Sequence, residues 1–219
     1  MAISSKKTTI TMSKSRTVLL VFTVGAAYTI WGICGSLLPP FFPIEAESKG
    51  AGTLQSGFVF GIFSLAGFIS SPLFGNYGSK VSPGYIYNPS AFVIAMCTLV
   101  FGCLSYIEDL TLFLGLAYIL RILSGMANAA AWGSLLAALI SLFPNHVSKV
   151  VAASELFYGI GYMLGPAIGA VLYSAGGFVL PFEITGGIAI LVSILMLVTI
   201  PKVNVLSNCL LYTSDAADE

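Results

Sequence analysis

Long runs of uncharged, mostly apolar residues divide the chain at regular intervals. Residues 17–44, 50–79, 81–107, 156–182 and 184–201 contain no Lys, Arg, Asp or Glu, and the run 110–148 is interrupted only by Arg121. A helix of about 20 apolar residues is long enough to cross a bilayer. The pattern therefore predicts six transmembrane helices. Their expected spans are 17–38, 54–74, 84–106, 110–142, 151–173 and 178–200.

Prolines and the leading tail set the expected ends of this region. Pro39-Pro40 and Pro43 are expected to close the first helix and Pro201 the sixth, because proline cannot continue the backbone hydrogen bonds. Residues 1–16 would form a tail before the bundle, which is expected to cover 17–203. The first apolar run exceeds the 7–15 residues of a signal-peptide core. We expect it to be retained, although the small residues at 25–27 leave a cleaved signal open.

Composition excludes several classes of protein. Hydrophobic residues make up 57% of the 219 positions and charged residues only 8%, whereas a soluble domain carries roughly 25% charged residues. Nine basic and nine acidic residues leave no basic surface for nucleic acid. Four cysteines and one histidine form no recognisable ligand set, so neither a metal nor a cofactor is expected. The lipid bilayer is the expected surrounding.

The distribution of Lys and Arg predicts the orientation. The N-terminal tail, the second and fourth connecting segments and the segment after the sixth helix together hold seven Lys and Arg residues. The opposite side holds only Lys49, beside four acidic residues. By the positive-inside rule, both the N-terminus and the end of the sixth helix are expected in the cytoplasm.

An internal repeat is visible when the chain is shifted by 98 residues. Four of twelve positions then coincide between the second and fifth helices, namely Ser56, Gly61, Ile62 and Gly67 with Ser154, Gly159, Ile160 and Gly165. The shift places the first three helices over the last three, as in the inverted repeats of secondary transporters. Chance similarity between glycine-rich helices is the alternative.

A glycine-rich motif in the fifth helix carries a family resemblance. Gly161, Gly165 and Gly169 recur every four residues, which gives a flat stripe for helix packing. With Pro166 after the second glycine, the stretch resembles the GxxxGPxxGG motif of major facilitator superfamily antiporters, from which only Ala170 departs. Residues 38–47, 74–77, 143–145 and 154–155, together with Arg121, resemble the vesicular amine transporter branch, most closely its polyamine-type member.

This resemblance covers about residues 17–203 and implies an all-α membrane protein. The expected fold is the six-helix N-terminal bundle of a twelve-helix transporter, built as a 3+3 inverted repeat, with the C-terminal half missing. Ser79 stands where the family's loop between helices two and three carries an acid, so that gate cannot work in its usual form. Residues 204–219 do not resemble the family, and their last eleven residues look like translated adapter sequence. We expect this tail to be artefactual.

Arg121 is the first candidate for a functional side chain. It lies eleven residues into the fourth predicted helix, about 16 Å along its axis and near the middle of the bilayer. Asn128 follows at i+7 on the same face. Ionisable groups at this depth are costly and usually have a task. The residue is expected to line a cavity and to fix its charge balance, and a buried ion pair or a carbonyl clamp is the alternative.

Glu155 is the second candidate. Tyr158 and Tyr162 follow at i+3 and i+7, so a carboxylate and two rings share one helical face. The carboxylate and the rings suit a substrate ammonium, and such an acid can also exchange a proton. A hydrated Glu155 near the cytoplasm, or one paired with Lys149, is the alternative. Tyr28 and Trp31 are further candidates for lining a cavity.

These features predict transport and no enzymatic activity. The sequence contains no phosphate-binding loop, HExxH or GxSxG motif. The resemblance implies proton-coupled antiport of organic cations or polyamines into vesicles, with Glu155 binding the amine or proton and the glycine motif shaping a gating helix. A complete six-helix pore or scaffold that dimerises through the glycine stripe is the alternative.

Overall fold

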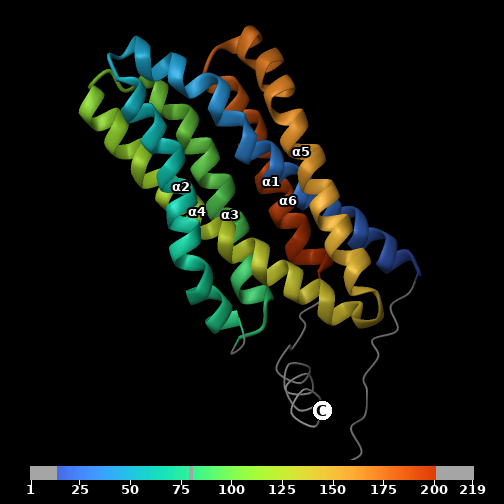
Figure 1. Cartoon of the computed structure of the whole chain (residues 1–219). Helices are drawn as coiled ribbons and strands as arrows, with labels where there is room; N and C mark the ends of the chain where they lie inside the picture. Colours follow the sequence, from blue (N-terminus) through green and yellow to red (C-terminus); the bar gives the residue numbers. More distant parts are fainter. Residues whose placement is uncertain (1–13, 79–80, 201–219) are drawn as a thin grey trace, which may run out of the picture.

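Six long helices run up and down through the molecule (Figure 1). The computed structural model describes residues 14–78 and 81–200. The helices are α1 (Lys14–Ser48), α2 (Thr53–Gly78), α3 (Gly84–Cys103), α4 (Leu110–Leu142), α5 (Val147–Gly176) and α6 (Val179–Thr199), with short 3-10 turns at Leu104–Tyr106 and Pro144–His146. Each is long and apolar enough to span a membrane. The predicted all-α membrane bundle is confirmed; Ser79 and the tail 204–219 lie outside the described residues.

The first helix does not end at its prolines, contrary to the expectation from sequence. α1 continues through all three and ends at Ser48. Pro39 and Pro40 lie on its exposed side, whereas Phe42 and Ala46 are fully buried. Packing of this last stretch outweighs the backbone hydrogen bonds that proline removes.

A polar cluster holds the end of α1 at the connection between α3 and α4. The Lys49 ammonium pairs with Glu45 at 3.5 Å and donates to the Ser105 carbonyl at 2.9 Å. The Ser105 hydroxyl in turn donates to the Glu45 carboxylate at 2.8 Å. At the next helix start, Asp109 caps α4 by accepting the Leu112 amide at 2.7 Å. The first three bonds tie the end of α1 to the end of α3 within the first repeat, and the fourth fixes the start of α4.

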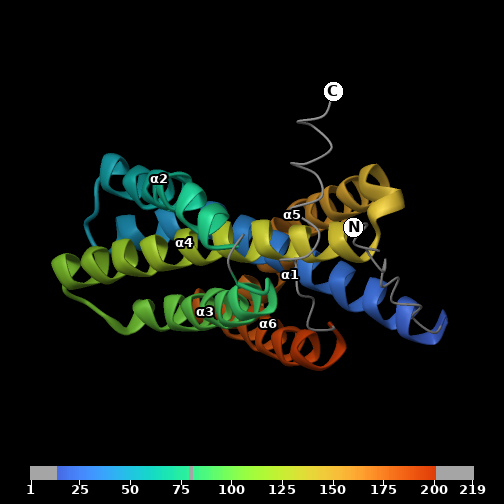
Figure 2. The ribbon, with the colours of Figure 1, turned by 90° about the horizontal axis from the view of Figure 1, so that it is seen from below.

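The helices pack in pairs that reproduce the predicted repeat. α1 packs chiefly along α5, α4 along α2, and α3 along α6. Shifting α1, α2 and α3 by 98 residues places them at 112–146, 151–176 and 182–201, close to the bounds of α4, α5 and α6. The α1–α5 pair therefore corresponds to the α4–α2 pair. In Figure 2, α2 and α5 lie along one side of the bundle and α3 and α6 along the other, with α1 and α4 between them.

Backbone contact at glycines brings the paired helices together. A Cβ on Gly161 would overlap the Thr29 carbonyl of α1, and one on Gly165 would overlap the Ser36 hydroxyl. In the equivalent pair, a Cβ on Gly125 would overlap the Phe63 carbonyl of α2. The stripe predicted as a dimer interface is therefore occupied by α1 of the same chain. This removes the basis for dimerisation through that stripe.

Substituting one stripe glycine tests this contact. We expect Gly161→Val to lower the melting temperature in detergent strongly, because overpacking against a backbone cannot be relieved by a rotamer change; losses of about 1–3 kcal/mol are typical. Gly159→Ala in the same helix is the matched control, because a Cβ there meets nothing within 4 Å. Equal melting temperatures for the two variants would show that α1 and α5 do not touch at this point.

Candidate functional site

A cavity lies at the level where the apolar core of the bundle is interrupted. One core cluster contains Trp31 and Ile94, and a second contains Leu38 and Phe101. All four of these residues also line a cavity of about 40 Å³ between the clusters. Polar and small side chains from α1, α3 and α4 fill the same level. The break in the core therefore places polar groups deep inside a membrane-spanning bundle.

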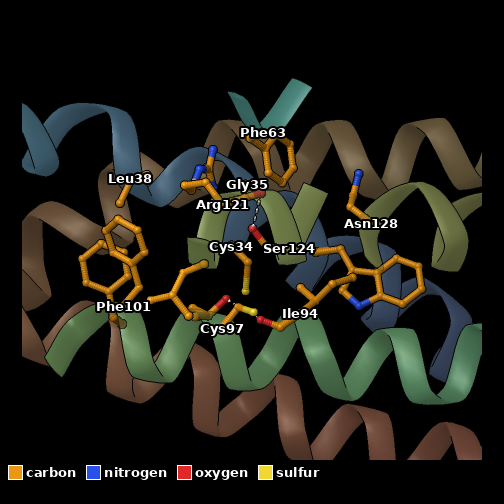
Figure 3. Close-up of a pocket in the computed structure, with 14 residues that line it drawn as sticks. Cys34, Gly35, Leu38, Phe63, Ile94, Cys97, Phe101, Arg121, Ser124 and Asn128 are labelled. Carbon is orange, nitrogen blue, oxygen red and sulfur yellow. Dashed lines mark hydrogen bonds between the residues drawn. The ribbon is translucent and has the colours of Figure 1, made fainter. Parts of the chain in front are cut away.

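Arg121 is the charged residue of this cavity (Figure 3). Its side chain is only 9% exposed. The Nε atom donates to the Val59 carbonyl of α2 at a long 3.4 Å, and the guanidinium stacks over the Phe63 ring at 4.1 Å from its centroid. The side chain thus touches a backbone carbonyl and also lines the cavity.

Small polar groups surround the guanidinium. Ser124 and Asn128 follow Arg121 along α4 and line the same cavity. The Ser124 hydroxyl donates to the Arg121 carbonyl at 3.2 Å. Two free thiols, Cys34 of α1 and Cys97 of α3, complete the polar lining shown in Figure 3. The predicted stripe of Arg121 and Asn128 thus lies on one wall of one cavity.

No carboxylate balances the charge of Arg121 within the described part of the chain. The ion pair found there, between Lys49 and Glu45, lies at the end of the bundle. Burying an unpaired guanidinium is costly, since the guanidinium loses hydration and gains only weak contacts. The cavity is therefore an electropositive site that suits a carboxylate or another hydrogen-bond acceptor.

The predicted residues of α5 lie apart from this cavity. Glu155 is exposed and does not line it, and it forms no ion pair with Lys149 or Arg121 among the described residues. Tyr158 is half-buried, and Tyr162, at 49% exposed, lies within electrostatic range of Arg121. α5 thus carries its carboxylate and its two rings outside the cavity, and Tyr162 is the ring that lies nearest to the guanidinium.

An aromatic row links α1, α4 and α5, and sequence reasoning missed its central member. Trp132 contacts Tyr28 at 4.9 Å and Tyr158 at 4.8 Å between ring centroids, in both cases edge to face. Trp31 lines the Arg121 cavity, whereas Tyr28 does not. The spacing along the sequence could have indicated Trp132, because this residue lies eleven residues, or three turns, after Arg121 on the same face of α4.

The Trp132–Tyr158 contact also fixes the register of two antiparallel helices. It places Asn128 opposite Tyr162, two turns away from Glu155 along α5. No hydrogen bond between Asn128 and Glu155 is found among the described residues.

The three glycines of the motif and its proline differ in environment. Gly161, Gly165 and Gly169 are buried against α1, while Pro166 is exposed on the other side of α5. The glycines therefore have a packing role, and the proline lies inside the helix at a position that faces away from that contact.

Comparison with known proteins agrees with this architecture. Residues 17–207 match the family model of the Major Facilitator Superfamily. The chain belongs to this superfamily, whose members are membrane transporters.

Individual relatives show which branch of the superfamily this chain resembles. The human MFS-type transporter SLC18B1 is 34% identical over 170 residues, which is 78% of this chain and 37% of that protein. The rat SLC18B1 is 32% identical over 184 residues, covering 84% of this chain and 38% of the relative. The Multidrug resistance protein MdtG of Enterobacter lignolyticus is 29% identical over 185 residues, covering 82% and 41%. The chain thus spans about two-fifths of the length of these relatives and resembles the SLC18 branch.

The unpaired charge of Arg121 predicts an unusual response to mutation. We expect Arg121→Met to keep or raise the melting temperature in detergent, because it removes a desolvated charge and keeps most of the side-chain volume. Arg121→Ala is the volume control and should lower stability by leaving a larger cavity. A marked loss in Arg121→Met would instead show that the contacts with Val59 and Phe63 outweigh the cost of burial.

Proposed function

We propose that this chain is the N-terminal half of a proton-coupled antiporter that moves organic cations of the polyamine type into vesicles. The main support is the match to SLC18B1 over 78% of the chain, in a superfamily of transporters. A bundle with a charged cavity at mid-depth suits this activity, because substrate sites of such transporters lie near the bilayer midplane. Both ends of the bundle would face the cytoplasm, as the Lys and Arg distribution predicts.

The second half of the proposed transporter would cover the side formed by α2 and α5. Large apolar side chains are exposed along these helices, among them Phe68 of α2 at 79% and Met163 of α5 at 81%. The cavity-lining residues of α4, and the face of α5 that carries Glu155, Tyr158 and Tyr162, would then face a closed path between two bundles. Chain beyond this sequence, with further transmembrane helices, would provide that half.

Arg121 would have a carboxylate partner in the complete transporter. The carboxylate could come from a side chain of the second half or from a transported molecule, and both would neutralise the buried guanidinium. With Asn128 beside it, Arg121 would tune the charge of the central site. A positively charged substrate would then avoid the guanidinium unless that partner is present.

Glu155 would bind the ammonium or the exchanged proton. It is the carboxylate that α5 presents on the same face as Tyr158 and Tyr162. An acid that accepts either a proton or a cation is sufficient to couple their movements in opposite directions. The rings would add cation–π attraction for the ammonium.

Uptake of radiolabelled spermidine into proteoliposomes tests the proposal. The full-length protein containing this chain, reconstituted with an acidic interior, should accumulate spermidine, and collapse of the proton gradient should abolish uptake. Glu155→Gln should reduce proton-driven uptake at least tenfold, since the amide cannot titrate.

The matched control is Glu183→Gln, an exposed acid in α6, which should leave uptake unchanged. Full uptake by Glu155→Gln would remove Glu155 from the mechanism. No spermidine uptake by the unmodified protein would refute the proposed substrate class.

A further inference from the structure

The aromatic row has a geometry that leaves one pair of rings available to a ligand. Tyr28 meets Trp132 at an interplanar angle of 78°, and Trp132 meets Tyr158 at 83°. Tyr28 is fully buried, whereas Trp132 and Tyr158 are only half-buried. Tyr28 therefore supports the Trp132 ring from behind, and Trp132 and Tyr158 each keep a partly exposed surface where α4 and α5 meet.

The charges nearest to these rings favour an ammonium there. The Glu155 carboxylate lies three residues before Tyr158, on the same face of α5. Arg121, without a carboxylate near it in the described chain, repels a cation from the central cavity. An ammonium is therefore drawn toward Glu155, and the rings of Trp132 and Tyr158 lie on that side of Asn128.

We propose that Trp132, with Tyr158 at its edge, is the platform on which an ammonium group of the substrate rests, and that it determines specificity for cations. Tryptophan is the best ring for this purpose, because its face carries the most negative potential. The inference rests on the proposed amine transport and deepens it, because it adds Trp132 to the ammonium site proposed at Glu155 and Tyr158. Tyr28 is the positioning residue that holds the indole.

Stepwise fluorination of Trp132 tests this platform directly. Each fluorine of mono-, di- and trifluorotryptophan withdraws electron density from the ring face and changes its shape little. A cation–π contact therefore weakens with each added fluorine. In the full-length protein we expect the KM for spermidine to rise in steps to about tenfold, with kcat little changed. A merely structural tryptophan would give a flat series.

Tyr106 is the control ring, because it is 73% exposed in the short turn after α3 and lies outside both the Arg121 cavity and the aromatic row. Fluorinated tyrosine at this position should leave the KM unchanged. Tetramethylammonium, which has no N–H donors, should compete with spermidine in the unmodified protein and lose about tenfold in inhibition with Trp132→Leu.

The outcomes separate the two proposals. Spermidine uptake with a flat series at Trp132 overturns the platform and leaves the antiporter proposal intact. Equal slopes at Tyr106 and Trp132 also overturn it, because the effect is then not specific to the platform. No amine uptake by the unmodified protein overturns the proposed function and the platform with it.

Discussion

Direct contact between helix backbones is the constraint on which this structure depends. Where α1 meets α5 and where α2 meets α4, a glycine lies against the carbonyl of its neighbour, and a single methyl group would separate the pair. Close approach of this kind maximises van der Waals contact where water provides no hydrophobic driving force between helices. The cavity and the aromatic row both sit on these pairs, so their geometry follows from the glycine contacts.

The distribution of charge is the second organising feature. A buried guanidinium lies between two apolar core clusters, while an exposed carboxylate lies several turns away on α5. Because these two groups do not neutralise each other, the bundle is positively charged at the Arg121 cavity and negatively charged at Glu155 on α5. The proposed transport of cations requires a site that binds its substrate weakly enough to release it. Aromatic rings bind a cation less tightly than a buried ion pair does.

The repeat explains why this six-helix bundle contains two equivalent packing contacts. The Gly161–Thr29 contact of the α5–α1 pair corresponds, after the shift of 98 residues, to the Gly125–Phe63 contact of the α4–α2 pair to within two positions. The glycine changes from one helix of the pair to the other. The close approach of the backbones is therefore common to both repeats, whereas the side chains on the other faces of these helices can differ between the repeats. This freedom allows Arg121 on α4 to have an uncharged counterpart, Thr23, on α1.

The sequence by itself determined the number of helices, their approximate spans and the family, because the length of an apolar run and a short glycine motif are local properties. It also determined that Arg121 lies at mid-depth, since depth follows from the rise per residue. Only the tertiary structure decided that α1 continues through its prolines, that Arg121 has no carboxylate partner in the described chain, and that Glu155 lies outside the central cavity. The role of Trp132 between Tyr28 and Tyr158 also emerged only there. These features depend on which faces of distant helices meet, and the order of residues along one helix does not contain that information.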